Sequence, residues 1–280
     1  MQLSRYLIIC AIASLSLFSC KENSPAEWVQ NPNVPENTGK KDPTPGNNEN
    51  TQSGYNEQYR PQFHYTPAKN WINDPNGLVY LDGTWHMFYQ YNPYSADWGN
   101  MSWGHATSTD LMHWTEQPVA ISKCAQGDIF SGSCVIDKDN TAGFGKNAMV
   151  AIYTANGTRQ QQNIAYSLDG GKTFEQFSGN PVIANTSREH FRDPKVFWHA
   201  ESSQWIMSLA LGTEYGIEFW GSPDLKNWTM LSQFKMPSVK SNGNIQWECP
   251  DLIRMNLNGK ELWTLIVSVN PGGPAGGSGT

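Results

Sequence analysis

The sequence predicts an all-β chain built from a repeated unit of strands. Its apolar residues alternate in short runs between turn signals, and no amphipathic stretch reaches three helical turns. Motifs that join an acid to a proline precede apolar runs at Asp74, Asp193 and Glu248. Asp193 follows Asp74 after 119 residues and Glu248 follows after a further 55, so the first interval is about twice the second. Repeats of this length with strands inside them predict the blades of a β-propeller.

A second series of motifs repeats with a similar period. Segments 108–114, 167–174 and 222–228 each begin with Ser-x-Asp and end in an aromatic residue, and their acids lie 59 and 55 residues apart. The middle segment matches the turn called an Asp box, so we interpret this series as structural hairpins. Roughly 220 residues at about 57 residues per unit give close to four units, which is enough for a large core.

The first 60 residues are predicted to lie outside the fold. Arg5 and the apolar run 6–18 resemble a signal peptide that is too short to span a bilayer, and Cys20 follows where a bacterial lipoprotein is processed. We therefore predict a signal over 1–20, lipidation at Cys20, and attachment to the bacterial cell envelope at the outer membrane or its periplasmic face. The alternative is an ordinary secretory signal with an incidental cysteine. Residues 21–60 are rich in polar residues and proline, which predicts a disordered tether.

Residues 61–280 are predicted to form the propeller. Short alternating runs predict its strands, the clearest of them at 78–80, 85–89, 148–153, 196–198, 205–209, 252–253 and 262–267. Asp82-Gly83 and Asn258-Gly259 resemble two-residue hairpin loops, in which both residues need positive φ.

Composition excludes several classes of function. A net charge of −6 without a basic patch argues against nucleic acid as a partner. The sequence has no zinc-type Cys/His spacing, phosphate-binding loop or dinucleotide fingerprint, so we predict no metal and no cofactor. Cys124 and Cys134 flank one strand and could form a disulfide, which their spacing alone does not decide.

The acid motifs are predicted to converge on one site. The innermost strand of each blade lines the central channel, so Asp74, Asp193 and Glu248 would face a common axis, with Ser131 in the place halfway across the first interval. Crowded carboxyl groups raise one another's pKa, and a charged acid beside a protonated one is what glycoside hydrolysis requires. We expect Arg192 to keep its neighbour Asp193 ionised. Four tryptophans near these motifs suit the apolar faces of a sugar: Trp71, Trp98, Trp103 and Trp247.

Six ordered motifs across residues 63–280 resemble glycoside hydrolase family 32, the invertases, inulinases, levanases and related β-fructofuranosidases. They are WINDPNG (71–77), FYQYNP (88–93), WGHA (103–106), FSGS (130–133), FRDPK (191–195) and WECPD (247–251). The resemblance implies a five-bladed propeller and a retaining double displacement on fructans or sucrose. Asp74 matches the family's nucleophile, Glu248 its acid/base and Asp193 its transition-state stabiliser. The positions matching sugar-binding residues of the family are Asn73, Gln90, Trp98, Ser131 and Arg192.

Simpler interpretations exist for several of these residues. Asn73 and Asn76 suit turns, Gln90 could bond a strand edge, and Ser131 could be small for close packing. His86, His105 and His113 are interpreted as local hydrogen-bonding groups without a catalytic role.

The sequence also departs from the family. A fifth blade and a β-sandwich are expected from the resemblance, whereas these residues supply about four blades and end in a Gly- and Pro-rich stretch at 270–280. We therefore expect an unclosed ring with exposed strand edges.

Two other functions stay open at this point. A fructosyltransferase would use the same acids, and a surface glycan-binding protein would bind without turnover. A sialidase is disfavoured because such enzymes use several arginines and this chain has one in an acid motif. Linkage preference, endo or exo action and oligomeric state are not specified by these motifs.

Overall fold

The computed structural model describes residues 57–61, 64–236 and 246–270. The predicted signal, Cys20, most of the predicted tether and residues 271–280 lie outside the described part. In the described ranges the regular structure is almost entirely β, with short 3-10 turns η2 (Ala200–Ser202) and η3 (Gly212–Glu214). None of the helices found there has the length and apolar character needed to cross a membrane.

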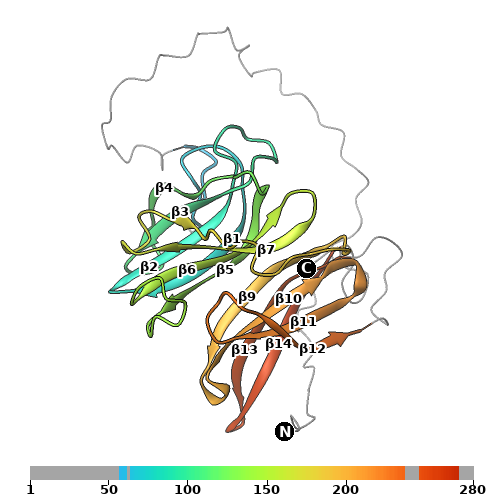
Figure 1. Cartoon of the computed structure of the whole chain (residues 1–280). Coiled ribbons are helices and arrows are strands. Elements are labelled where there is room, and N and C mark those ends of the chain that lie inside the picture. Colours follow the sequence, from blue (N-terminus) through green and yellow to red (C-terminus); the bar gives the residue numbers. More distant parts are fainter. Residues whose placement is uncertain (1–56, 62–63, 237–245, 271–280) are drawn as a thin grey trace, which may run out of the picture. The chain divides into compact units, whose positions relative to one another are not determined.

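The strands form antiparallel sheets in chain order, each sheet one colour range in Figure 1. The first sheet is β1 (Ile72–Leu81), β2 (Thr84–Tyr91), β3 (Ser102–Ser108) and β4 (Thr115–Ile121). The second is β5 (Asp128–Asp137), β6 (Ala148–Asn156), β7 (Gln160–Ser167) and β8 (Glu175–Gln176). The third is β9 (Phe191–His199), β10 (Gln204–Leu211), β11 (Gly216–Ser222) and β12 (Thr229–Lys235). A two-stranded sheet follows, made of β13 (Gln246–Leu257) and β14 (Lys260–Asn270).

The first strand of each sheet contacts the first strand of the next. β1 contacts β5, β5 contacts β9, and β9 contacts β13. Four-stranded meanders whose first strands adjoin one another are propeller blades. The described residues thus form three blades and the first two strands of a fourth, which confirms the predicted all-β propeller fold.

The predicted turns take their expected conformations. Asp82 and Gly83 have φ of 46° and 86°, and Asn258 and Gly259 have φ of 54° and 80°, as two-residue hairpin loops require. In the Asp box, Asp169 Oδ1 accepts hydrogen bonds from the backbone N–H groups of the two residues that precede Phe174. The same pattern recurs in the other two Ser-x-Asp segments, which confirms that the series is structural.

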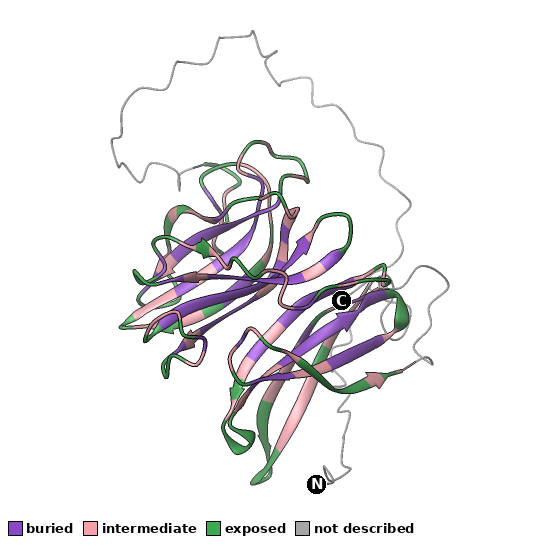
Figure 2. Ribbon diagram, in the orientation of Figure 1, coloured by how far each residue is buried: buried purple, intermediate pink, exposed green. Residues whose placement is uncertain are grey.

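Two apolar clusters lie between successive blades. One joins the first and second sheets and includes Phe88, Trp103 and Tyr153, and the other joins the second and third sheets and includes Ile152 and Leu209. Figure 2 shows buried residues along strands of the four-stranded sheets and exposed residues at the turns, whereas β13 and β14 are mostly intermediate or exposed. Apolar interiors are packed without large voids. The packing between blades therefore fixes the position of each inner strand relative to the next.

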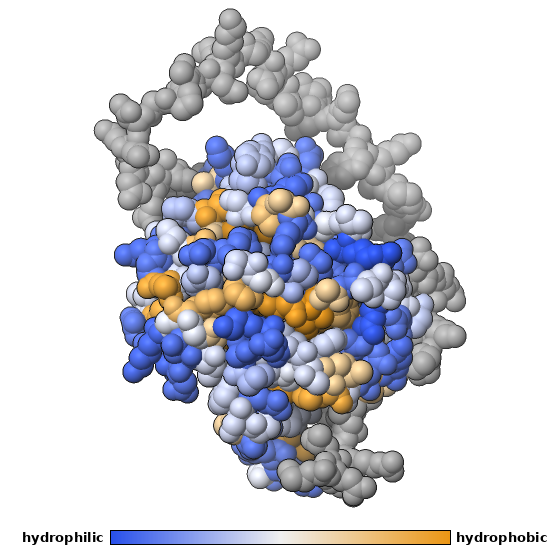
Figure 3. Space-filling view, viewed as in Figure 1, coloured by the Kyte–Doolittle hydropathy of each residue, from blue (hydrophilic) through white to orange (hydrophobic). Residues whose placement is uncertain are grey.

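Some large apolar side chains remain on the surface. Leu78 and Tyr80 of β1 and Ile266 of β14 each expose about half of their area. Figure 3 shows apolar residues gathered in a band across one face of the molecule, among mostly polar surroundings. Among the described residues β14 pairs only with β13, as expected for an unclosed ring.

The cysteines among the described residues are thiols. Cys124, Cys134 and Cys249 are all free, so the disulfide that the sequence left open between Cys124 and Cys134 is not formed.

Candidate active site

The acid motifs lie inside the inner strands and not in turns that precede them. β1 begins at Ile72, and its pairing with β2 is interrupted between Ile72 and Pro75 and again between Asn76 and Val79. The pairing of β13 with β14 is interrupted between Glu248 and Asp251. The Asn, Pro and Gly residues, whose types suit turns, thus form β-bulges within the strand, which bend it and re-aim its side chains.

Bulges also mark the other two inner strands. In β5 the register shifts between Ile129 and Gly132, and in β9 it shifts close to Asp193, whose φ is 63°. A Cβ atom added to Gly132 would lie 2.0 Å from the carbonyl oxygen of Ile152, so only glycine allows β5 and β6 to approach this closely. The close approach sets the position of the neighbouring Ser131.

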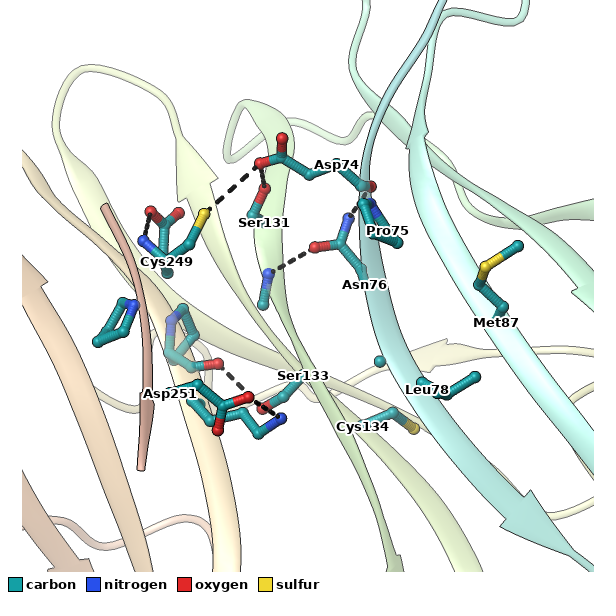
Figure 4. Close-up of a pocket in the computed structure, with 16 residues that line it drawn as sticks. Asp74, Pro75, Asn76, Leu78, Met87, Ser131, Ser133, Cys134, Cys249 and Asp251 are labelled. Carbon is teal, nitrogen blue, oxygen red and sulfur yellow. Dashed lines mark hydrogen bonds and ion pairs between the residues drawn. The ribbon is translucent and has the colours of Figure 1, made fainter. Parts of the chain in front are cut away.

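All eight predicted site residues line one cavity of about 550 Å³. The predicted residues that line it are Asn73, Asp74, Gln90, Trp98, Ser131, Arg192, Asp193 and Glu248. The lining residues that the sequence did not single out for this site are Met101, Phe130, Gln160, His190, Gln246, Cys249 and Ser268. A second hollow of about 370 Å³ shares Asp74, Ser131, Asp193 and Cys249 with it and is drawn in Figure 4.

Asp74 is oriented by residues of two other blades. The Ser131 hydroxyl donates to Asp74 Oδ2 at 2.6 Å, and Cys249 Sγ lies 3.8 Å from the same oxygen. Figure 4 shows the second carboxylate oxygen of Asp74 pointing away from both. Ser131 thus does more than allow close packing, because its hydroxyl fixes the rotation of the carboxylate.

Asn76 is a buried link between blades and not a turn residue. Its side chain is 4% exposed, its Oδ1 accepts from the Gly132 N–H at 3.1 Å, and its Nδ2 donates to the Asp74 carbonyl at 3.2 Å. The amide therefore ties the bulge of β1 to that of β5.

Gln90 on β2 also links two blades through its side-chain amide. Its Nε2 donates to the carbonyl oxygen of Ile129 at 3.0 Å, so it bonds a strand as the simpler interpretation held, while it also lines the cavity. Asn73 is exposed beside it on the same cavity wall.

Asp193 is buried, with 7% of its area exposed. Its Oδ2 accepts from the Cys249 N–H at 2.9 Å. Burial raises the pKa of Asp193 to about 6; Glu248 and Asp74 add to the rise, and Arg192 and the Cys249 N–H oppose it. Arg192 lowers the pKa of Asp193, as expected, but by less than burial raises it, because the cost of desolvating the carboxylate exceeds the attraction of the guanidinium. A pKa of about 6 still leaves most of the Asp193 carboxyl groups ionised at pH 7.

Arg192 pairs with Glu248 on the adjacent blade. Its Nη2 donates to Glu248 Oε1 at 2.6 Å and also to Gln246 Oε1, whereas its Nε lies 3.9 Å from Asp193 Oδ2. On its other side Nη1 contacts His190 Nδ1 at 2.7 Å and Gln160 Oε1 at 3.4 Å. No sequence motif includes Gln246, His190 or Gln160. These residues lie in separate segments of the chain and meet only because the strands pair in this register.

Only two of the four predicted tryptophans reach the cavity. Trp71 lines it, and Trp98 stands at it with 63% of its area exposed, edge-on to Phe130. Trp103 is fully buried in the core, where its Nε1 donates to the Phe130 carbonyl oxygen, and Trp247 is 3% exposed. The expectation of sugar contact was wrong for Trp103 and Trp247, because their rings pack between strands.

Comparison with known proteins agrees with this geometry. Residues 64–279 match the family described as the glycosyl hydrolases family 32 N-terminal domain. The chain belongs to glycosyl hydrolase family 32. It is 49% identical to the levanase of Bacillus subtilis (strain 168) over 234 residues, which cover 81% of this chain and 34% of that protein. It is 43% identical to an extracellular exo-inulinase of Aspergillus niger over 259 residues, which cover 81% of this chain and 48% of that protein.

A solved family 32 structure has a similar fold. The β-fructofuranosidase of Schwanniomyces occidentalis, complexed with fructosyl-erythritol, superposes with a TM-score of 0.72 at 47% identity, covering 80% of this chain and 45% of that one. The family 32 resemblance in the sequence is confirmed. The chain spans between a third and a half of the length of these relatives.

Proposed function

We propose that the protein is a retaining glycoside hydrolase that cleaves β-fructofuranosyl linkages in fructans or sucrose. The observation that carries the proposal is the convergence of Asp74, Asp193 and Glu248, from three different blades, on one cavity. Two carboxyl groups with separate roles, acting on opposite sides of a glycosidic bond, are the machinery of retaining hydrolysis. The names of the relatives, which include a levanase and an exo-inulinase, support fructose polymers as the substrate class.

In the first step Asp74 attacks the anomeric carbon of the fructosyl unit. The Ser131 hydroxyl holds Oδ2, so the other oxygen is directed toward the substrate and forms the ester. Glu248, protonated at this stage, gives its proton to the oxygen of the leaving sugar as the glycosidic bond breaks. The products of this step are the free leaving sugar and a fructosyl ester of Asp74.

In the second step water resolves the ester. Glu248, now a carboxylate, takes a proton from water, and the oxygen of that water attacks the anomeric carbon while the bond to Asp74 breaks. Fructose leaves with retained configuration, and Glu248 is protonated again. Asp193 and Arg192 border the same cavity, where they can bond sugar hydroxyls, and Trp71 and Trp98 supply apolar contact surface.

Release of reducing sugar from levan, inulin and sucrose by the natural protein tests this proposal. We expect fructose from at least one of the three, with retained anomeric configuration in early product spectra, and none from the Asp74→Ala variant. Binding of these sugars without release would favour a glycan-binding protein instead. Transfer products that exceed free fructose at high sucrose would favour a fructosyltransferase.

We also propose that Cys20 carries a lipid that attaches the protein to the bacterial cell envelope. The support is the sequence alone, in which the apolar run 6–18 ends just before Cys20. Because stable anchoring needs more than one acyl chain, loss of the modified cysteine should release the protein from the membrane. Detergent partitioning of Cys20→Ala tests this, and a variant that still follows the detergent phase as the natural protein does would contradict it.

A further inference from the structure

His190 stands beside the acids in the cavity wall, at the end of the segment that leads into β9. Its backbone is held by the third blade, since the Gly212 N–H donates to the His190 carbonyl oxygen at 2.9 Å. A Cβ atom on Gly212 would lie 2.8 Å from the Cβ of His190, so glycine permits this contact. Two residues earlier, Arg188 Nη2 bonds Glu218 Oε1 at 2.6 Å, and Glu218 is 1% exposed. The backbone of His190 is thus held by η3, and the segment before it by β11.

The contact between His190 and Arg192 specifies the protonation state of the imidazole. His190 Nδ1 lies 2.7 Å from Arg192 Nη1. A guanidinium can only donate hydrogen bonds, so Nδ1 must accept this one, and the proton of the neutral ring must be on Nε2. An imidazolium has no acceptor, so protonation of His190 would break the bond.

Arg192 transmits this contact to Glu248. The guanidinium is 7% exposed and has His190 at Nη1 and Glu248 Oε1 at Nη2. Because the guanidinium is planar and rigid, an acceptor at one nitrogen fixes the direction of the others. His190, Arg192 and Glu248 therefore form a hydrogen-bonded series that ends at the acid/base of the proposed reaction.

We propose that His190 is a positioning residue that holds Arg192, and through it Glu248, in the reactive orientation, and that protonation of His190 sets the acidic limit of activity. This inference rests on the proposed function, because it assigns His190 a role in that reaction.

The charges that face His190 agree with a neutral ring near pH 7. Burial lowers the pKa of His190, and Arg192 lowers it further, while Glu189 and Glu248 oppose them. Glu189 Oε1 lies 4.0 Å from His190 Nε2. Glu214 of η3, which packs nearby, forms its ion pairs with Arg188 and Lys235. As the pH falls through the pKa of His190, a second positive charge appears beside the guanidinium, and we expect Arg192 to leave its place.

Two substitutions of His190 separate positioning from a merely structural role. The Oδ1 atom of an asparagine side chain can take the place of Nδ1 as an acceptor and does not titrate, so His190→Asn should keep activity at pH values where the natural protein has lost it. His190→Leu removes the nearer acceptor of Arg192 Nη1 and leaves only Gln160 Oε1 at 3.4 Å, so it should lower kcat about tenfold or more, with a smaller change in KM. His113→Asn is the matched control, since His113 is exposed and pairs with Asp110 in a distant turn.

The experiment measures kcat and KM for fructose release between pH 4 and pH 8 for the natural protein and these three variants. An acidic limit that shifts by at least about half a pH unit in His190→Asn and stays unchanged in His113→Asn supports the inference. An unshifted limit in His190→Asn, or unchanged kcat in His190→Leu, overturns it.

A second measurement is independent of turnover. Nitrogen chemical shifts of ¹⁵N-labelled histidine, assigned by comparison with His190→Asn, report which ring nitrogen carries the proton. The inference requires Nε2–H at pH 7 and a higher pKa for His190 in Arg192→Gln. A proton on Nδ1, or a pKa that Arg192→Gln leaves unchanged, overturns it. If the natural protein releases no fructose, the proposed function fails and the role of His190 in that reaction fails with it, whereas the titration still decides whether neutral His190 accepts a hydrogen bond from Arg192.

Discussion

Arg192 bonds Glu248 of the next blade at 2.6 Å, whereas its nearest ion-pair distance to Asp193, its neighbour in the chain, is 3.9 Å. Arg192 and the backbone N–H of Cys249 both stabilise the buried carboxylate of Asp193. Burial outweighs both, so the pKa of Asp193 is raised to about 6 although a guanidinium lies close to it.

Replacement of Asp193 by asparagine should stabilise the free protein at neutral pH while abolishing turnover. The folded-state pKa of about 6 is above the unfolded value of 3.8, so the folded state binds more protons between these values and its stability falls as the pH rises through that range. A difference of about two pKa units corresponds to at most about 3 kcal/mol above pH 6. We expect Asp193→Asn, which keeps an acceptor for the Cys249 N–H, to recover part of this free energy.

Thermal unfolding at pH 7 and at pH 3.5 measures this effect. The gain in Tm should be present at pH 7 and nearly absent at pH 3.5, where Asp193 is neutral in both states. Asp139→Asn, at an exposed position in the loop after β5, is the control. An equal gain at both pH values would show that the carboxylate charge is not its source.

Asp74→Ala should lower turnover by a factor of about a thousand or more while leaving sugar binding largely intact, because the covalent step has no other nucleophile. Steady-state release of fructose measures the loss. Azide that attacks from the vacated space would form fructosyl azide and free the leaving sugar, so azide should restore part of the rate of glucose release from sucrose. Ser131→Ala, which keeps the carboxylate and removes its 2.6 Å hydrogen bond, should lose far less, about tenfold. More than about a tenth of the natural rate in Asp74→Ala would exclude Asp74 as the nucleophile.

Glu248→Gln should remove the basic limb of the pH–rate profile, because that limb reports the group that must be protonated for the first step. Glutamine retains an oxygen for Arg192 Nη2, so the guanidinium should keep its place and binding should change little. The check is the pH dependence of kcat/KM for sucrose and for a substrate with a good leaving group, which should be affected far less in the first step. A basic limb that persists unchanged in the variant would assign the proton to another group.

The protein should lose stability in acid through a histidine pair formed by β2 and β3 of the first blade. His86 Nδ1 and His105 Nε2 lie 3.0 Å apart, both side chains are buried, and burial, with a smaller effect of His86, lowers the pKa of His105 to about 3. A folded pKa below the unfolded value means that the unfolded state binds more protons below about pH 6.5, so stability is present at neutral pH and falls as the pH decreases toward 3. His105→Gln should weaken this dependence.

The measurement is Tm between pH 7 and pH 4 for the natural protein, His105→Gln and the exposed control His113→Gln. The slope of Tm against pH should be smaller in His105→Gln and unchanged in the control. Parallel slopes in all three would show that the acid sensitivity arises elsewhere.

The sequence was sufficient to predict the fold class and a set of residues that line one cavity. Periodic motifs and alternating apolar runs report local strand structure, which is why the meander and its hairpin loops were predictable. The eight residues predicted for the site line one cavity because they lie on the inner strands, on β2 beside β1, or on the loop after β2.

The features that the sequence did not predict depend on how distant strands pair and on how the blades pack. The Asn-Asp-Pro-Asn-Gly stretch has the composition of a turn, and only pairing with β2 makes it a bulge. Gln160, His190 and Gln246 meet at Arg192 from β7, the segment before β9, and β13, and no local pattern specifies such a meeting. Likewise, whether a tryptophan faces a sugar or a neighbouring sheet depends on the packing of blades.

The inter-blade bond between Asn76 and Gly132 has a consequence for the order of folding. Each blade is a meander of neighbouring segments, so its strands can pair through short loops soon after collapse. The hydrogen bonds that align Asp74 with Ser131, and Arg192 with Glu248, join residues 57 and 56 positions apart and form only once separate blades have docked. During refolding, recovery of the far-ultraviolet signal of strands should therefore precede recovery of activity, and the lag between them measures the time the blades need to find their mutual alignment.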